Sequence, residues 1–490
     1  MSDFSNKLQF YLERLNLSAY RLSKLSGMER TGIHRVITGQ RLPSDRFMFS
    51  VLPHLRLNHM EEKELWKLLT IERIGRETFE ERLRISQIFW EIDRYRKLYS
   101  SGVHSSFSKD IDQPFNNKSQ VVNLRSQHQV RACLHGLLKG LVIPQEGGEL
   151  YFNFTENLSL IADLLLQLDS QEQSRLHIHQ YVEVSRGDPS DGSDLEILRR
   201  ILPLALSFHG AYDVFYAYSS QTENDPLLRL FPCCLLAGEY TLRISSDWNS
   251  GLLIHSSEIT RSFAEEFQRL HSRYNALIDK RAFSLDAVEY YCFTVQNGRA
   301  PDYVYESWPC LMRVLGEVAS KIDSPQLRPY MGVANQLSQN YYNLSDHITH
   351  YFALEGMEEF VRTGVLPGYA GLLAGPVPTQ ERGALLKKIC GQAEEHPGSD
   401  RLIRTNQFPV ISGLFVEIYG RERVCIGHQD PKFPFIILCL TEPHICAAFY
   451  DFFESMDGSD MLYSEEETQK LISGFLLRSN EQLSKEEELS

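Results

Sequence analysis

The stretch at residues 17–44 constrains the fold of this chain more than any other part of the sequence, because it specifies two short helices and the turn between them. Ser18 is placed to cap a helix that stops at Gly27, a residue suited to the left-handed position after a helix C-terminus. A second helix is predicted from Glu29, whose charge favours a helix N-terminus, to Gly39. Two helices of about eight to ten residues joined by a glycine turn form a helix-turn-helix.

Three further helices are predicted around this pair, which makes a five-helix N-terminal domain. The first, residues 4–15, has apolar side chains spaced i, i+3, i+4 and i+7, which places them on one face. The fourth helix begins at Ser44 or Asp45, both of which are suitable caps. The fifth begins after Asn58, which forms an N-x-x-E capping box with Glu61. The apolar residues of the first and fourth helices are Leu8, Tyr11, Leu12, Leu15, Phe47, Met48, Val51 and Leu52.

The helix that precedes Gly39 has a basic face. Its apolar residues pack inward together with Leu22 and Met28, and the face left over carries Arg30, Thr31, His34, Arg35 and Thr38. The first 60 residues hold nine Lys and Arg against four acids, a net charge of +5 in a chain whose total is −14, which leaves −19 for the rest. A basic segment attracts polyanions that an acidic body repels. We therefore expect residues 1–73 to bind nucleic acid and the remainder not to.

The stretch LSAYRLSKLSGMERTGIHRVITGQRLPS resembles the helix-turn-helix domains of the phage-repressor family, also called Cro-like or XRE-type. Members typically read Leu-small-x-x-x-Gly-apolar-polar-Arg-x-x-Ile-x-x-Ile-x-x-Gly, followed by a basic loop and a proline. This chain matches at Leu22, Ser23, Gly27, Met28, Glu29, Arg30, Ile33, Val36, Gly39 and Pro43. It departs from the commonest residues at Ser23, which is small as the pattern requires but is often alanine in the family, and at Leu25, which is usually polar. The resemblance covers about residues 4–70.

The resemblance implies double-stranded DNA as the partner and assigns roles to matched residues. Positions equivalent to Arg30, Thr31 and Arg35 usually contact base edges in the major groove, where an arginine can bind guanine through two hydrogen bonds. The residues expected to contact the DNA backbone are Ser18, Arg21, His34, Gln40 and Arg41. Repressors of this type read two half-sites as dimers, so a homodimer is expected as well.

Residues 74–98 are predicted to form a connecting helix, and residues 99–120 an exposed linker. The helix has apolar residues at helical spacing beside many charges, namely Phe79, Leu83, Phe89, Ile92 and Tyr95. It could transmit a signal, pair two protomers or cap the N-terminal domain, and the sequence leaves all three open. The linker is polar and rich in Ser, Asn and Gly.

Behind the linker, two α/β lobes are predicted at residues 121–280 and 285–475, because the chain repeats itself there, and residues 476–490 form a polar acidic tail. The first copy of the repeated residues is His209, Asp213, Asp247, Ser257, Glu258, Phe263 and Phe267. The second copy is His396, Asp400, Asp430, Thr441, Glu442, Phe449 and Phe453. The strand-then-helix endings resemble the pseudo-symmetric phospholipase-D-like lobes in topology, but both copies lack the His-x-Lys motif of those enzymes. The expected fold class is multidomain, an all-α domain followed by α/β lobes.

No catalytic residue, metal site or cofactor is predicted. The chain has no phosphate-binding glycine loop, no Gly-x-Ser-x-Gly and no Cys-His nucleophile signature. Four residues could supply zinc ligands, but the two cysteines lie in apolar strand-like runs where they can point inward: Cys425, His428, Cys439 and His444. His177 and His179 point to one side of a strand, where a solvated strand face is the default and a metal the alternative. The same interpretation applies to His347 and His350, one helical turn apart.

The longest apolar run, residues 433–440, is too short to span a bilayer, and the N-terminus has no signal-peptide pattern. We therefore expect a cytoplasmic protein without membrane contact. The sequence as a whole predicts a sequence-specific transcriptional regulator whose C-terminal region dimerises or senses a small-molecule or protein effector. Two alternatives stay open. The chain could be an enzyme or defence effector whose helix-turn-helix domain autoregulates its operon, or a repressor with a purely structural C-terminal region.

Overall fold

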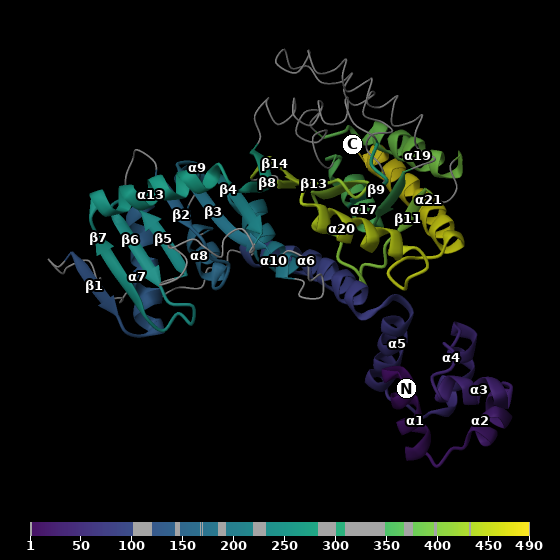
Figure 1. Ribbon diagram of the computed structural model, residues 1–490. Helices are drawn as coiled ribbons and strands as arrows, with labels where there is room; N and C mark the ends of the chain where they lie inside the picture. Colours follow the sequence, from purple (N-terminus) through teal and green to yellow (C-terminus); the bar gives the residue numbers. More distant parts are fainter. Residues whose placement is uncertain are drawn as a thin grey trace. The chain divides into compact units, whose positions relative to one another are not determined.

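The computed structural model describes residues 2–100, 120–142, 148–166, 168, 170–184, 193–218, 232–282, 300–308, 348–366, 376–395, 399–430 and 433–489 (Figure 1). The chain divides into two compact units, which we call unit 1 (residues 1–83) and unit 2 (residues 84–490). The described residues of unit 1 form helices without strands, whereas unit 2 combines helices with a large mixed sheet. Most of the predicted linker, residues 101–119, lies outside the described residues.

Unit 1 contains α1 (Asp3–Arg14), α2 (Ala19–Ser26), α3 (Arg30–Ile37), α4 (Asp45–Val51), a 3-10 turn (Leu52–His54), α5 (His59–Ile74) and the start of α6 (Arg76–Ser100). Three predicted caps are confirmed. The Ser18 hydroxyl accepts a hydrogen bond from the Arg21 N–H, the Ser44 hydroxyl accepts one from the Phe47 N–H, and Asn58 and Glu61 form both bonds of the capping box. Of the apolar residues predicted for the first and fourth helices, all are buried except Leu15, which is partly exposed.

Unit 2 contains fourteen strands among its described residues. They are β1 (Val121–Leu124), β2 (Gly148–Phe152), β3 (Leu176–Val184), β4 (Ala211–Tyr218), β5 (Cys233–Ala237), β6 (Tyr240–Ile244), β7 (Gly251–His255), β8 (Asn275–Ala282), β9 (Tyr303–Glu306), β10 (Thr349–Phe352), β11 (Asp400–Leu402), β12 (Leu414–Tyr419), β13 (Arg423–Asp430) and β14 (Phe433–Leu440). Besides α6, its helices are α7 (Gln127–Val142), α8 (Leu158–Leu165), α9 (Ser170–Ser174), α10 (Ser193–Ser207), α13 (Ser257–His271), α17 (Leu354–Thr363), α19 (Thr379–Glu395), α20 (Pro443–Met456) and α21 (Glu465–Leu489).

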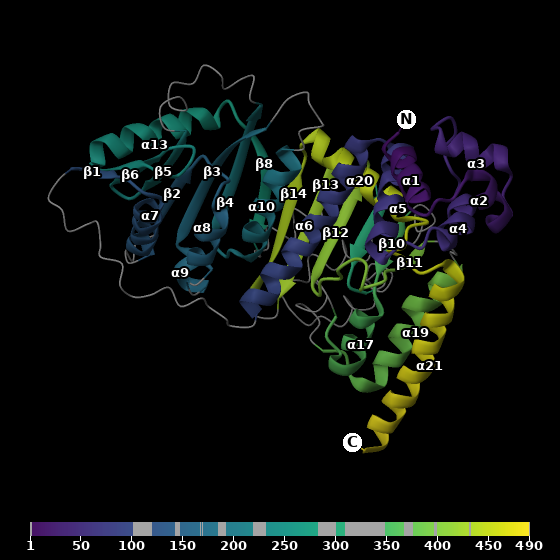
Figure 2. The same ribbon diagram turned by 90° about the horizontal axis from the view of Figure 1, so that it is seen from below.

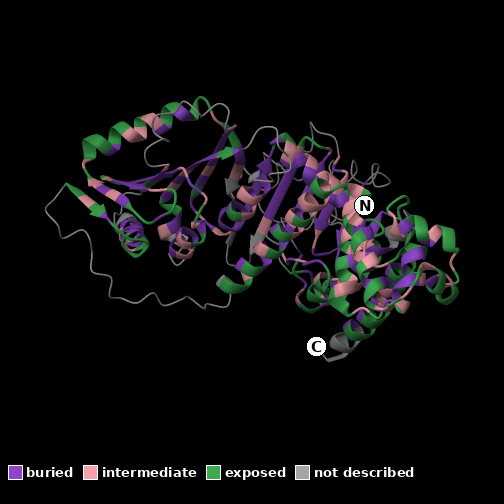
Figure 3. Ribbon diagram, turned by 60° about the horizontal axis from the view of Figure 1, so that its bottom comes forward, coloured by how far each residue is buried: buried purple, intermediate pink, exposed green. Residues whose placement is uncertain are grey.

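These strands form one sheet in the order β1-β7-β6-β5-β2-β3-β4-β8-β14-β13-β12-β9-β10-β11 (Figure 2). Strands β2, β3 and β4 are mutually parallel, and so are β9, β10 and β11. All other neighbouring strands are antiparallel, including β4 and β8 at the centre of the sheet. Strand β5 is apolar and buried along its whole length, as expected of a strand covered on both faces, and Figure 3 shows most of the strand residues as buried.

Successive side chains of a strand point to opposite faces of the sheet. Different helices cover these two faces. In the half that holds β2, β3 and β4, Tyr151, Tyr181 and Phe215 pack against α13 on one face. On the other face, Phe152 and Ile178 belong to a core that also contains apolar residues of α7, α8 and α10. In the half that holds β12, β13 and β14, the residues of α20 share this second core rather than the first.

The predicted connecting helix is α6, and its C-terminal half belongs to unit 2. Phe89 is 1% exposed and its ring lies within 5.0 Å of the rings of Tyr305 and Phe408. The buried face of α6 consists of Ile85, Ile88, Phe89, Ile92 and Tyr95. Leu83, which the helical spacing placed on the same face, is instead 43% exposed, because the buried stripe starts two residues later.

The end of the chain is helical and partly buried. Helix α21 runs through residue 476, where the sequence analysis placed the start of an acidic tail. Its Phe475 and Leu483 lie in a separate core with apolar residues of α17 and α19. Apolar residues spaced along α21 therefore anchor residues that composition alone assigned to a tail.

Candidate nucleic-acid interface

The pair of helices α2 and α3 in unit 1 is defined by a turn with a left-handed residue. Gly27 has a φ of +70°, and a Cβ added to it would meet nothing within 4 Å, so glycine is needed for the backbone conformation and not for space. Across the turn, the Ser23 hydroxyl donates a hydrogen bond to the Met28 carbonyl at 2.6 Å. Serine, one of the two departures from the family pattern, thus makes a bond that the usual alanine cannot make. The other departure, Leu25, is 54% exposed and takes no part in the core.

Helix α3 buries one face and leaves the other to solvent. Ile33 and Val36 are 0% and 2% exposed and pack in the unit 1 core with Leu22. The eight residues predicted to contact DNA are all exposed, namely Ser18, Arg21, Arg30, Thr31, His34, Arg35, Gln40 and Arg41. Thr38, which was placed on the same face, caps the end of the helix instead, since its hydroxyl donates to the His34 carbonyl at 2.9 Å.

The cations of unit 1 differ in whether an acid neutralises them. Arg21, Arg30, Arg35 and Arg41 form no ion pair with any described residue. Four other cations of the unit pair with acids, in Lys7–Glu64, Arg14–Glu61, Arg73–Asp45 and Arg76–Asp3, whereas some outside α2 and α3, such as Arg46 and Lys63, also form no ion pair with the described residues. The arginines in and beside α2 and α3 therefore keep their charge for a partner outside the chain.

Tyr20 is a candidate contact residue that sequence reasoning did not single out. It lies in the first turn of α2, is 55% exposed, and its ring centroid is 5.9 Å from the guanidinium carbon of Arg30 and 5.9 Å from the Lys24 ammonium. A ring under a guanidinium restricts the side chain and so can orient Arg30. No local pattern signals this contact, because it exists only once α2 and α3 have packed together.

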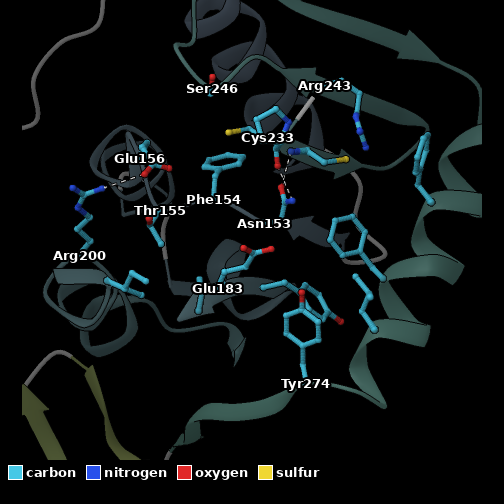
Figure 4. Close-up of a pocket in the computed structure, with 18 of the residues that line it drawn as sticks. Asn153, Phe154, Thr155, Glu156, Glu183, Arg200, Cys233, Arg243, Ser246 and Tyr274 are labelled. Carbon is cyan, nitrogen blue, oxygen red and sulfur yellow. Dashed lines mark hydrogen bonds and ion pairs between the residues drawn. The ribbon is translucent and has the colours of Figure 1, made fainter. Parts of the chain in front are cut away.

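Unit 2 contains a cavity of about 570 Å³ where β2 and β3 end (Figure 4). Asn153, directly after β2, donates to the Pro232 carbonyl at 2.8 Å and accepts from the Cys234 N–H at 2.7 Å, which holds the start of β5 beside it. The lining also includes Glu183 at the end of β3 and Arg243, whose guanidinium lies 5.3 Å from the Phe263 ring. Carboxyl ends of parallel strands are the usual ligand position in α/β sheets, and this volume is within the range of ligand pockets.

The four residues considered as zinc ligands do not assemble into one group. Cys425 and Cys439 are buried cross-strand partners with their Sγ atoms 3.2 Å apart, and the hydrogen bond between them together with burial raises the pKa of the Cys425 thiol. His444 lies against Asp194 instead, with 2.5 Å between Nδ1 and Oδ2. Of the pair His347 and His350, the first lies outside the described residues. The second lies in strand β10 and is 1% exposed, so the prediction of a helical position on a solvated face is wrong for His350.

Comparisons with known proteins leave the family of this chain open. No family model and no curated protein matches it. A solved structure of TrmBL2, an archaeal chromatin protein with a novel mode of DNA binding, matches 54% of this chain and 91% of its own, at 9% identity and a TM-score of 0.22. The phosphatidylserine synthase of Haemophilus influenzae Rd KW20 matches 80% of this chain and 99% of its own, at 9% identity and a TM-score of 0.23. Scores this low assign neither a fold nor a function.

A search of the described helices for membrane spans finds none that is both long enough and apolar enough to cross a bilayer.

Proposed function

We propose that this protein is a sequence-specific DNA-binding transcriptional regulator, in which α1 to α5 form a helix-turn-helix domain of the phage-repressor type. The observation that carries the proposal is the exposed basic face of α3, where Arg30 and Arg35 have no ion-pair partner among the described residues. This face occurs in a chain whose net charge is −14, so its charge is local and not a property of the whole molecule. A single α-helix fits the major groove of DNA, where base edges can be read.

In the proposed complex, Arg30, Thr31 and Arg35 contact base edges. Ser18, Arg21, His34, Gln40 and Arg41 contact phosphates and set the register of the domain on the duplex. The N-terminus of α2 supports this role for Ser18 and Arg21, because backbone N–H groups at a helix start bind anions well.

The first experiment is selection of bound fragments from random DNA with the purified full chain, followed by titration of the selected sequence. Arg30→Ala and Arg35→Ala should each cost about 1–3 kcal/mol on that sequence and relax the preference at one position. Lys63→Ala, an exposed cation on α5, removes the same charge and serves as the matched control. If the double Arg variant binds the selected sequence as tightly as the control does, the assignment of α3 is wrong.

We infer that unit 2 consists of two copies of one seven-stranded module. Strands β1 to β7 occupy the sheet in the order first-seventh-sixth-fifth-second-third-fourth, and β8 to β14 follow the same order with the parallel triplet in the same place. Because β8 is antiparallel to β4, each strand of the second copy runs opposite to the corresponding strand of the first copy. The two copies are therefore related by a half-turn about an axis that lies in the sheet and runs perpendicular to the strands. Such a rotation also exchanges the faces. This agrees with α13 and α20, each of which follows the seventh strand of its copy and packs on the opposite face.

The residues that suggested the repeat support the same inference. Asp213 and Asp400 lie in the fourth strands, β4 and β11. Asp430 ends the sixth strand of the second copy, β13, and Asp247 lies three residues after the sixth strand of the first copy, β6. The Ser/Thr-Glu pairs stand at the starts of α13 and α20, and the phenylalanine pairs lie within these helices. His396 lies outside the described residues.

Unit 2 in this proposal dimerises the protein and senses an effector. The cavity beside Asn153 and Glu183 is the candidate effector site, and α6 is the covalent connection between this unit and the DNA-binding unit. An effector with unequal affinity for two arrangements of the protein would change the spacing of paired α3 helices and therefore the affinity for the operator. Repeating the DNA selection in the presence of cell extract tests for such an effector.

A further inference from the structure

We propose that unit 2 contains a binding site for a divalent first-row transition metal ion, formed by His177 and His179 of β3, Asp213 of β4 and Glu149 of β2. The proposal concerns a site in the sheet and does not depend on DNA binding by unit 1. Its donors come from three neighbouring strands, so the sheet itself fixes their positions.

The register of the parallel strands brings the four side chains to one face. Glu149 is the cross-strand partner of His177, and His179 is the partner of Asp213. Glu149, His177, His179 and Asp213 all occupy positions whose side chains point to the α13 face, since Tyr151, Tyr181 and Phe215 on the same strands pack there. A pair of histidines two residues apart on one strand is thus completed by a carboxylate from each neighbouring strand.

The donor atoms of Glu149 and the two histidines are close enough to share one ion, and Asp213 lies beside both histidines. One ligand atom each of Glu149, His177 and His179 lies within 4.8 Å of the other two. His177 Nε2 lies 2.7 Å from Asp213 Oδ2, and His179 Nδ1 lies 3.8 Å from the same oxygen. In a tetrahedral site, imidazole and carboxylate donor atoms lie about 2.0–2.2 Å from the ion. Small side-chain adjustments bring the donor atoms of this cluster to the mutual separations that such a site requires.

The surroundings of His179 hold its ring in place and leave it able to bind a metal. Tyr151 stacks on the His179 ring with 4.5 Å between centroids, and the Tyr151 hydroxyl donates to Glu149 Oε2 at 2.6 Å. His179 Nε2 is buried and makes no hydrogen bond within the described part of the chain.

The site is also open to solvent. The side chains of His177 and Asp213 are 39% and 40% exposed, whereas that of His179 is 13% exposed. Two imidazoles with two carboxylates suit zinc, cobalt or nickel better than magnesium or calcium, which prefer oxygen ligands alone. The other described group of this kind, Asp194, Glu442 and His444, offers one imidazole, and both oxygens of Glu442 already accept hydrogen bonds from Tyr218 and Ile445.

The test is calorimetric titration of the untagged, EDTA-treated full chain with Zn²⁺, together with the visible absorption spectrum after addition of Co²⁺. We expect one site that is weakened by more than about 10–100-fold in His177→Gln and in Asp213→Asn, because loss of a ligand costs more than loss of a ligand's hydrogen-bond partner. In the wild-type chain Co²⁺ should produce ligand-field bands that both variants lose. Mg²⁺ should not compete.

The matched control is His255→Gln in the same unit. His255 also lies beside a carboxylate, 3.3 Å from Glu239, and stacks on a tyrosine, Tyr240, but among the described residues it belongs to no group of three metal-binding side chains. This variant should bind Zn²⁺ like the wild type. Thermal melting without metal shows whether His177→Gln is folded. If that variant does not fold, Asp213→Asn, which keeps the side-chain shape, provides the metal-binding result. Equal Zn²⁺ affinity and stoichiometry in the wild type and in the folded site variants would overturn the proposal, because the ion would then be bound elsewhere, for example by cysteines.

Discussion

Two exposed arginines of unit 1 that form no ion pair with the described residues, Arg35 and Arg41, differ in position. Arg35 lies on α3, whereas Arg41 lies beyond Gly39 in the following loop, where its side chain is exposed and not tied to an acid of the described chain. We expect Arg41→Ala to weaken binding to every sequence alike and to reduce the slope of log affinity against log salt by about 1, since one phosphate contact is lost. Fluorescence anisotropy over a series of salt concentrations, with the selected and a scrambled duplex, measures both quantities. A change in sequence preference for Arg41→Ala would contradict its assignment to the backbone.

Glu61 makes the stability of unit 1 depend on pH. The side-chain bond from Arg14 and then the backbone bond from Asn58 lower the pKa of this carboxyl below its ordinary value of 4.5. A carboxyl with a lowered pKa contributes stability that is present above the ordinary value and is lost as the pH falls through the folded-state value. We expect the melting temperature of unit 1 to fall less between pH 6 and pH 3 in Glu61→Gln than in the wild type. Identical pH profiles of the two proteins, followed by circular dichroism, would show that Glu61 contributes nothing.

At the scale of helices and strands, local signals and tertiary contacts differ in what can be predicted from them. Ser18, Gly27 and Asn58 act within a few residues of themselves, so the helices of unit 1 and their caps follow from the sequence. The contact of Tyr20 with Arg30 depends on packing between helices, and the pairing of His179 with Asp213 depends on the register between strands 34 residues apart. Neither of these two contacts has a local sequence pattern that predicts it. The spacing of His177 and His179 was visible, but nothing in the sequence indicated that Glu149 and Asp213 complete the group.

Helix α6 is the element whose role the structure defines most sharply. Phe89 is central to the core of unit 2, with five aromatic rings within 6.5 Å, while its neighbour Trp90 is 42% exposed. Phe89→Ala should therefore lower the free energy of unfolding of unit 2 by about 3–5 kcal/mol, the usual cost of deleting a buried aromatic ring. Trp90→Ala, on the exposed side of the same helix, should change it by no more than about 0.5 kcal/mol. Urea unfolding followed by far-ultraviolet circular dichroism compares the two, and equal effects would mean that α6 is not part of this core.

At the scale of the whole molecule, the proposed function requires two copies of the chain. One α3 offers two arginines for base contacts, and each good contact discriminates by about 1–3 kcal/mol, or about 2–6 kcal/mol together. Specific binding exceeds non-specific binding by about 4–10 kcal/mol, so one helix covers only the lower part of that range. A dimer that places two α3 helices on one operator doubles the discrimination.

The selected operator should accordingly contain two half-sites whose centres are about 10–10.5 base pairs or a multiple of that apart, so that both lie on one side of the duplex. An insertion of 5 base pairs between them turns one half-site to the opposite side, and we expect it to reduce affinity to that of a single half-site. Light scattering of the free protein and hydroxyl-radical footprints of the complexes measure the number of protomers and the spacing. Undiminished binding to an isolated half-site by a monomer would exclude the dimer and would require contacts from other parts of unit 1 to supply the missing specificity.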